Sequence, residues 1–248
     1  MDKTLLKGLK VLDALAQAPR PMGVTEVAET MGLVKSNAHR VLQTLVAAGY
    51  ATPVADTGKY RASLKLWSLG TQLAVYADLR LIAAPVLGRL RDATGETAFL
   101  AMLDREHVTY VDVQSSAKAL RVHTPVGARL PAHGTAAGKL LLAFDGDAAR
   151  AFLADAHERY TRHTLESQAA LEAELIKIRQ QGWAVNRGEF REEISGIAVP
   201  IMDADKKVIA SVGISGPTER FRPAAIKEWL SLVQVAGLEL SRTLGAQV

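Results

Sequence analysis

The chain has 248 residues, of which 48% are hydrophobic and 23% are charged. This composition is typical of a globular protein with a buried core, and it excludes collagen-like, low-complexity and wholly disordered chains. Cysteine is absent, which excludes disulfides, thiolate zinc sites, iron–sulfur clusters and cysteine nucleophiles. No segment has the roughly 20 apolar residues of a membrane-spanning helix, and no signal-peptide pattern follows the first lysines. We therefore expect a cytoplasmic protein with no membrane partner.

The positive charge is concentrated near the N-terminus. The net charge is +4, and residues 1–62 carry eight Lys and Arg against five Asp and Glu. The other 186 residues carry 22 against 21. A small basic segment joined to a nearly neutral larger one suggests a polyanion-binding module attached to a second function.

Hydrophobic spacing in the first 62 residues predicts three helices followed by a hairpin. The helices are expected at residues 3–18, 24–30 and 36–49, and the strands at 50–53 and 59–62. The helical pattern resumes over residues 64–94, where Pro85 should either kink the helix or begin a new one. Its apolar stripe is either a partner-binding face or core, and at least part of it must be core. We place an N-terminal domain at 1–62, a linker helix at 63–79 and a second domain at 80–248.

The second domain alternates between strands and helices. Strands are expected at residues 97–103, 107–114, 121–124, 183–187, 195–203 and 208–215, and helices at 135–144, after Asp147 as a cap, at 167–181 and from Pro223 to about 244. Strands in pairs with a few separate helices predict an α+β fold with a mainly antiparallel sheet.

Residues 24–45 fit a helix-turn-helix. Ala28 supplies the small residue that two crossing helices need, and Gly32 supplies a permissive backbone for the turn. Arg and Asn can bond bases bidentately, while Lys and Ser hold phosphate. The candidate DNA contacts are Lys35, Ser36, Asn37, His39, Arg40, Gln43 and Thr44 on the second helix, with Lys59 and Arg61 on a hairpin that would act as a wing. The alternative is a helical hairpin with a solvated polar face, and the basic hairpin that follows favours DNA.

Residues 27–45 resemble the winged helix-turn-helix of the IclR family of bacterial transcriptional regulators. Residues 130–139, 196–203 and 211–217 resemble the effector-domain motifs of the same family, in the same order along the chain. The resemblance implies a GAF-like effector domain, a homodimer or homotetramer bound to palindromic double-stranded operator DNA, and control by a small metabolite. No cofactor is implied.

A candidate effector site surrounds the start of the helix at 135–144. Thr135 is expected to cap this helix, leaving the N–H groups of Ala136, Ala137 and Gly138 without intrahelical partners. The helix dipole favours an anion there, and a carboxylate is a natural ligand. We therefore expect a small organic acid, aromatic acids included, as the effector. The alternative is a capped structural helix in which Gly138 serves packing.

The resemblance adds further residues to this site. Ala136 and Ala137 match positions that bond ligand through the backbone, and Glu189 matches an acidic position common in the family. Asn186, Gly196 and Gly213 stand where some relatives carry a carboxylate, Cys and Ser, so the ligand's identity does not carry over. Polar contacts are also expected from Arg121, His123, Arg187 and Ser215, and apolar contacts from Leu130 and Ile197.

No catalytic or metal-binding pattern emerges. Residues 134–139 are one residue short of a Walker A loop, and Leu140 stands where Ser or Thr would bind magnesium. Residues 213–216 lack the spacing of a nucleophile elbow, and the six histidines are scattered. The leading hypothesis is a ligand-responsive DNA-binding regulator without enzymatic activity. The alternative is a metabolite-binding protein or enzyme whose winged helix contacts other proteins.

Overall fold

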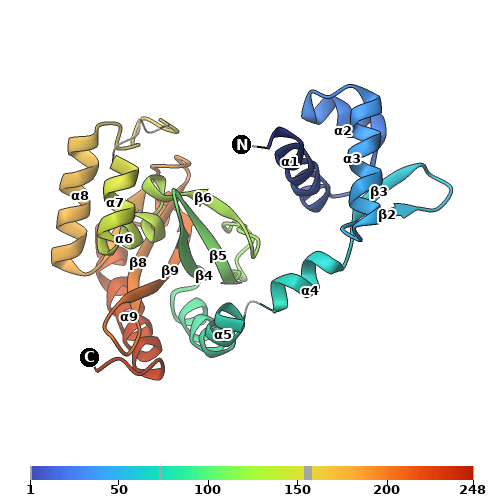
Figure 1. Cartoon of the computed structure of the whole chain (residues 1–248). Helices are drawn as coiled ribbons and strands as arrows, with labels where there is room; N and C mark the ends of the chain where they lie inside the picture. Colours follow the sequence, from blue (N-terminus) through green and yellow to red (C-terminus); the bar gives the residue numbers. More distant parts are fainter. Residues whose placement is uncertain (1, 73, 154–157, 248) are drawn as a thin grey trace. The chain divides into compact units, whose positions relative to one another are not determined.

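The structure is a computed structural model that describes residues 2–72, 74–153 and 158–247. The chain divides into two compact units, residues 1–75 and 76–248 (Figure 1). Each unit has its own hydrophobic core. Within the described residues, no helix is long and apolar enough to cross a membrane.

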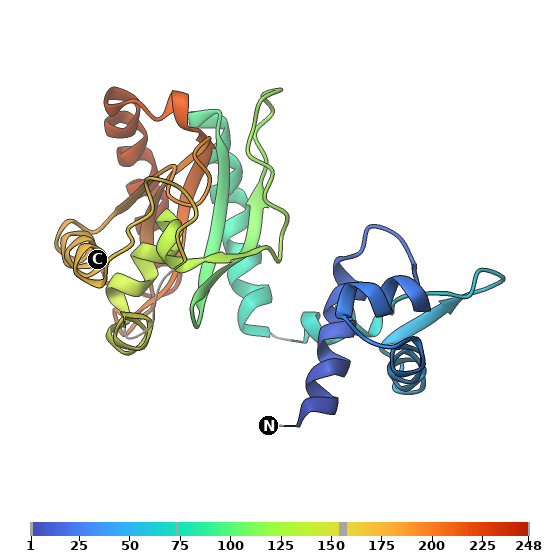
Figure 2. The same cartoon turned by 90° about the horizontal axis from the view of Figure 1, so that it is seen from above.

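The N-terminal unit packs three helices against a small antiparallel sheet of order β1-β3-β2 (Figure 2). Its elements are α1 (Lys3–Gln17), β1 (Met22–Gly23), α2 (Val24–Met31), α3 (Lys35–Ala47), β2 (Ala51–Val54), β3 (Lys59–Ala62) and the short α4 (Lys65–Thr71). The Asp2 side chain caps α1 by accepting hydrogen bonds from the amides of Thr4 and Leu5. Strand β1 has only two residues, too few for its pattern to show in the sequence.

The crossing of α2 and α3 confirms the helix-turn-helix. Ala28 is 4% exposed and belongs to the core that the three helices share. Gly32 ends α2 in the left-handed conformation (φ 61°, ψ 36°), which a glycine adopts without a Cβ penalty. The hairpin of β2 and β3 then follows α3, as expected for a winged helix-turn-helix.

The C-terminal unit is built on a six-stranded sheet of order β6-β5-β4-β9-β8-β7, in which every neighbouring pair is antiparallel. The strands are β4 (Thr97–Asp104), β5 (His107–Gln114), β6 (Arg129–Pro131), β7 (Ala184–Arg187), β8 (Ile194–Met202) and β9 (Val208–Pro217). The helices are α5 (Ala74–Thr94), α6 (Ala136–Phe144), α7 (Gly146–Leu153), α8 (Gln168–Gln181) and α9 (Pro223–Thr243), with 3₁₀ turns η1 (Ala132–Gly134) and η2 (Thr218–Arg220).

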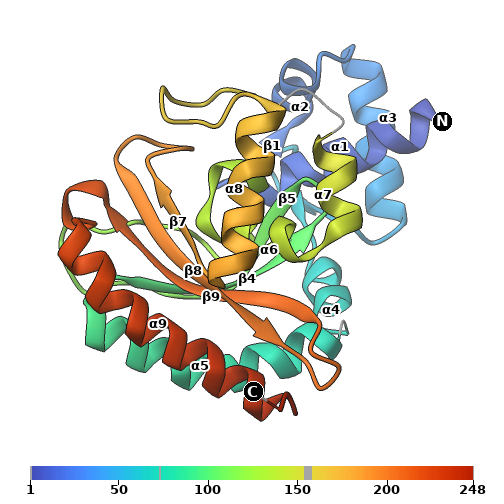
Figure 3. The same cartoon turned by 90° about the vertical axis from the view of Figure 1, so that its left-hand side faces the viewer.

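Helices cover both faces of this sheet (Figure 3). Helices α5 and α9 lie along one face, over a core that includes Leu87, Ile201 and Val212. Helices α6, α7 and α8 lie on the other face, where Phe99 and Leu140 are among the buried residues. This arrangement confirms the α+β class and the antiparallel sheet.

Two local predictions were wrong, and a third was resolved. Residues 121–124 form no strand, because residues 127–131 already occupy the free edge of β5: the Tyr110 amide donates to Ala128 O and its carbonyl accepts from the Gly127 amide. The cap of α7 is Asp145, whose carboxylate accepts from the Ala148 amide, whereas Asp147 lies inside the first turn. Helix α5 continues through Pro85.

Candidate functional site

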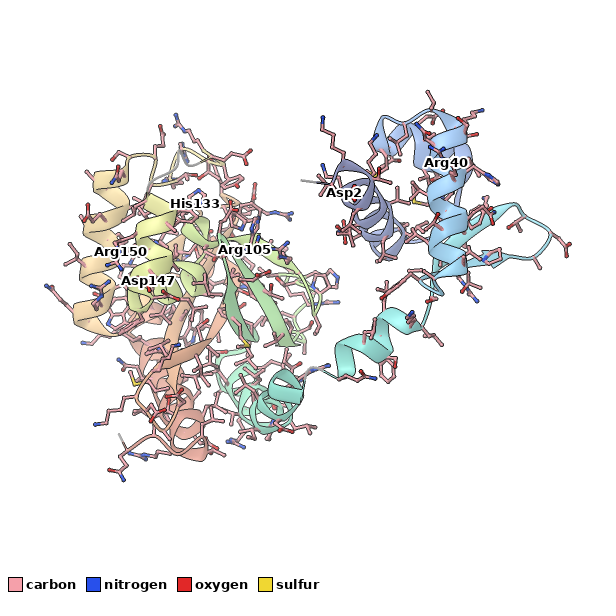
Figure 4. The ribbon with its side chains drawn as sticks, viewed as in Figure 1. Asp2, Arg40, Arg105, His133, Asp147 and Arg150 are labelled. Atoms are coloured by element: carbon pink, nitrogen blue, oxygen red, sulfur yellow. The ribbon has the colours of Figure 1, made fainter. Side chains whose placement is uncertain are left out.

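The candidate DNA-contacting surface is the polar face of α3 together with β3. Ala38, Leu42 and Leu45 are buried against the other helices, which turns the opposite face to solvent. Of the candidate residues, Lys35, Ser36, His39, Arg40, Gln43, Thr44 and Arg61 are exposed, and Asn37 and Lys59 are half-buried. Figure 4 marks Arg40 on α3.

Hydrogen bonds divide these residues into two groups. Arg40 Nη2 donates to Asn37 Oδ1 (2.9 Å), so Asn37 supports the arginine one turn along the helix. Gln43 Nε2 donates to the hydroxyl of Tyr60 on β3 (3.0 Å), which ties the helix to the wing. Thr44 Oγ1 donates to the Arg40 carbonyl (2.9 Å). Asn37, Gln43 and Thr44 therefore have structural contacts, whereas the guanidinium of Arg40 is held outward.

The N-terminus of α3 has features suited to phosphate. Val34 occupies the cap position and provides no capping side chain, and the first turn holds no acidic residue. The Asn37 amide donates to Val34 O (3.0 Å), but the amides of Lys35 and Ser36 have no acceptor within the described residues, and their dipoles favour an anion. Lys35 and Ser36 stand at this same end and add a charge and a hydroxyl.

The C-terminal unit has a cavity of about 140 Å³ on the α6 side of the sheet, between the strands, the start of α6 and the loops at 122–128 and 188–193. Seven predicted effector residues line it: His123, Leu130, Thr135, Ala136, Asn186, Gly196 and Ser215. Arg121, Ala137, Gly138, Glu189 and Gly213 do not line it, nor do Arg187 and Ile197.

The start of α6 differs from the prediction at one atom. Thr135 caps the helix as expected, but its Oγ1 accepts from the Gly138 amide (3.1 Å), so that amide is not free for a ligand. A Cβ on Gly138 would lie 2.3 Å from both Cα and O of Ala132, so this glycine allows α6 to pack closely on η1. Ala136, 4% exposed, is the residue of the first turn that faces the cavity.

Hydrogen-bond donors without protein partners face this cavity. Asn186 is 5% exposed, and its Oδ1 accepts from the Glu189 amide (2.8 Å), which leaves the Nδ2 hydrogens for the cavity. Ser215 is 8% exposed. Within the described residues, neither Asn186 Nδ2 nor the Ser215 hydroxyl has a hydrogen-bond partner. Both donors open into the cavity and are therefore available to a group bound there.

The charges around the cavity favour an anion. Arg191 and His123 line its exposed side, and none of the described residues that line it is acidic. Arg191 was not predicted; Arg121, which was, donates to the Lys118 carbonyl (3.3 Å) outside the cavity. A carboxylate in the cavity would be stabilised by the dipole of α6, by the neutral donors of Asn186 and Ser215, and by the positive charge of Arg191.

A buried ion pair holds the loop at 188–193 over the cavity. Lys139 of α6 is 1% exposed, and its Nζ lies 2.7 and 2.6 Å from the two carboxylate oxygens of Glu189 and 2.9 Å from Val185 O. Thr164 Oγ1 donates to the Glu189 carbonyl (2.7 Å). Glu189 therefore supports the cavity by fixing the neighbouring Phe190 and Arg191, which line it.

Gly213 also affects the shape of the cavity, although it does not line it. A Cβ at this position would lie 2.1 Å from Ile197 O and 2.6 Å from Cζ of Phe99. The Phe99 ring, which lines the cavity, thus occupies the space of a side chain at 213. The sequence shows that Phe99, Tyr110 and Val122 are apolar and in strand-like segments, but it carries no signal that brings them to one cavity.

A second hollow, of about 650 Å³, lies beside α7 and is lined by residues that include Arg105, His133, Asp147 and Glu158. The first three of these are labelled in Figure 4. It mixes acidic and basic side chains, and His133 contacts Glu158 O through Nε2 (2.9 Å). In the smaller cavity, by contrast, the charge of the lining and the free donors both suit an anion.

Comparisons with known proteins match both units. The model "IclR helix-turn-helix domain" matches residues 4–55, and "Bacterial transcriptional regulator IclR C-terminal" matches residues 71–242. The HTH-type transcriptional regulator XynR of Escherichia coli (strain K12) is 33% identical over 241 residues, which cover 96% of each chain.

Solved structures agree with this match. The Thermotoga maritima IclR has a TM-score of 0.76 at 29% identity and covers 98% of each chain. An IclR homologue from Microbacterium hydrocarbonoxydans, complexed with 4-hydroxybenzoate, has a TM-score of 0.83 at 24% identity over 98% of this chain and 99% of its own. The chain therefore belongs to the IclR family of bacterial transcriptional regulators, which are not enzymes.

Proposed function

We propose that this regulator binds operator DNA through α3 and the β3 wing and that a small organic acid in the α6 cavity controls that binding. Family membership implies the coarse function: a DNA-binding N-terminal unit and an effector-binding C-terminal unit. The observation that supports the acid is the cavity itself, in which a helix N-terminus, unpartnered donors and Arg191 meet without any acidic lining residue among those described. Because it acts on chromosomal DNA, we place it in the cytoplasm.

An aromatic acid is the subclass that the lining suits best. Phe99 and Tyr110 pack edge to face with ring centroids 5.1 Å apart, and both line the cavity with Phe190. Aromatic walls bind flat apolar groups well, and a few polar groups then fix orientation. The structural neighbour that is complexed with 4-hydroxybenzoate supports the same class here.

Self-association as a dimer or tetramer is part of the proposal. In the N-terminal unit, Leu5 and Leu9 on α1 are 62% and 50% exposed, and Leu64 and Trp67 near α4 are 84% and 72% exposed. Large apolar side chains left exposed at a surface often mark interaction sites. A second copy of the chain would cover them and present a second α3 to the other half of a palindromic operator.

Gel-shift titration on the protein's own upstream intergenic DNA tests the DNA assignment. Arg40→Ala should weaken operator binding by about 1–3 kcal/mol if the guanidinium bonds a base in two places. Lys177→Ala, at an exposed position on α8 of the C-terminal unit, is the control. Unchanged affinity in the Arg40 variant would reject α3 as the reading helix and favour a winged helix that contacts proteins.

The same titration with acids added tests the effector. An acid that raises the melting temperature of the protein and changes the operator dissociation constant would support the proposal, because a ligand of the native state stabilises it by mass action. Acids that leave both quantities unchanged, while sugars or amines change them, would reject it.

A further inference from the structure

Tyr110 is a buried residue whose hydroxyl group no contact in the protein explains. It lies on β5, is 5% exposed and lines the effector cavity. Its ring packs on Phe99, but within the described residues its hydroxyl has no hydrogen-bond partner. Tyr60 in the N-terminal unit is buried to a similar degree, and its hydroxyl accepts from Gln43.

The Tyr110 hydroxyl opens into the cavity and is not sealed in the core. Buried tyrosines usually bond their hydroxyl, and a phenylalanine ring would fill the same space without the oxygen. The hydrogen-bonding capacity of this hydroxyl is therefore available to whatever occupies the cavity. Burial raises the pKa of the Tyr110 hydroxyl, so the group is a neutral donor around neutral pH.

The sheet register separates Tyr110 from the other free donors. Asn186, Gly196, Ser215 and Thr97 lie opposite one another in a single row across β7, β8, β9 and β4. Tyr110 lies opposite Ala101, one strand beyond β4 and four residues along from that row. With strands about 4.8 Å apart and residues about 3.3 Å apart, the Tyr110 and Ser215 backbones are roughly 10 Å apart across the sheet and 13 Å along it.

Phe99 occupies the space between these two donor sites. It lies on β4, two residues from Thr97 of the row and two from Ala101 opposite Tyr110. Its ring lies against Gly213 and lines the cavity. A carboxylate held by Asn186 and Ser215 thus has an aromatic surface beside it and the Tyr110 hydroxyl beyond that surface. A two- or three-carbon acid is too short to reach both ends.

We propose that Tyr110 is a specificity-determining residue whose hydroxyl binds a second oxygen of the effector, at the end remote from the carboxylate. The inference rests on the proposed acid effector and adds the class: a ring-bearing acid with a hydroxyl or carbonyl oxygen opposite its carboxylate.

Two matched pairs of probes test the inference: benzoate with 4-hydroxybenzoate, and phenylacetate with 4-hydroxyphenylacetate. Each pair differs only in the remote hydroxyl. The full chain is titrated calorimetrically with all four acids as wild type, Tyr110→Phe and Tyr160→Phe. Tyr160 is the control because it lies outside the lining, and the pKa of its hydroxyl is raised by burial and by the neighbouring Glu158. In Tyr110→Phe we expect roughly tenfold weaker binding of a hydroxylated acid and less than about threefold change for its partner. The Tyr160 variant should match wild type.

The outcomes separate this inference from the acid proposal. If acids bind and alter operator affinity, but Tyr110→Phe weakens both members of a pair equally or neither, the role of Tyr110 is wrong and the acid effector stands. If none of the four acids binds a protein that still binds operator DNA, the role of Tyr110 and the aromatic subclass both fail, and the wider screen of acids, sugars and amines decides the acid proposal. Tyr110→Phe should also melt at or above the wild-type temperature. A fall of several degrees would show a structural partner for the hydroxyl and overturn the inference.

Discussion

Replacing Lys139 with methionine tests how the effector cavity is held together. Lys139 has 1% of its side chain exposed and donates to Glu189 Oε1, with Oε2 also within ion-pair distance, and the Glu189 side chain is 10% exposed. Methionine fills a similar volume, but it removes the positive charge that is paired with the buried Glu189 carboxylate. Breaking a buried ion pair by removing one partner costs about 3–5 kcal/mol. For a unit of this size, each kcal/mol lowers the melting temperature by about 2–4 °C.

We therefore expect Lys139→Met to melt about 6–20 °C below wild type, as followed by circular dichroism at pH 7. Lys177→Met is the matched control, because Lys177 is 64% exposed and its nearest acidic oxygen, on Glu174, is 3.8 Å away. Such exposed pairs contribute about 0–1 kcal/mol. The double variant Lys139→Met, Glu189→Leu should regain much of the loss, since no orphan charge remains.

The reasoning would be refuted by a Lys139→Met protein as stable as the Lys177 variant. It would equally be refuted if the double variant were no more stable than Lys139→Met, since the orphaned carboxylate would then not be the cause. The single variant should also bind acids more weakly, because Phe190 and Arg191 lie on the loop that the ion pair fixes.

Three further outcomes are expected. Ala136→Asp should bind operator DNA as wild type but lose the response to acids in gel shifts, because its carboxylate occupies and repels the site of an anionic ligand. Gly138→Ala should lower the unfolding free energy in urea by about 1–3 kcal/mol through overpacking on Ala132, whereas Gly146→Ala, where a Cβ meets nothing within 4 Å, should not. Since the pKa of Tyr110 is raised on folding, the native state keeps a proton that the unfolded phenol loses near pH 10. Stability should therefore be unaffected by this group below about pH 10 and fall above it, and urea midpoints at pH 9 and 11 should differ less in Tyr110→Phe.

Local signals in the sequence were enough for most of the fold. The structure that these signals produce depends on residues within one or two helical turns, so it could be predicted from the sequence. Examples are the apolar spacing of the first helices, the turn at Gly32 and the cap formed by the Thr135 hydroxyl. Strand placement at 121–124 failed because it depends on which segment takes the free edge of β5, and residues 127–131 take it.

The cavity was predictable only where it is made of contiguous residues. Thr135 and Ala136 belong to one helix start and were found. Tyr110 and Arg191 come from a strand and a loop about 80 residues apart, and only the sheet order brings them together. Glu189 was assigned to the ligand because its charge is visible, whereas its partner Lys139 is not visible from spacing, being 50 residues away in the chain.

The contact between Phe99 and Gly213 has a consequence for how the cavity can change in evolution. With 2.6 Å between the ring and the place of a Cβ, and 2.1 Å between that place and Ile197 O, a side chain at 213 needs both a smaller residue at 99 and a shift of β8 away from β9. Relatives that keep phenylalanine at 99 should therefore keep glycine at 213, and a side chain at 213 should accompany an aliphatic residue at 99. A lineage that makes this exchange replaces an aromatic surface with a hydroxyl and moves a strand of the sheet, and so changes the chemistry and the shape of the cavity together.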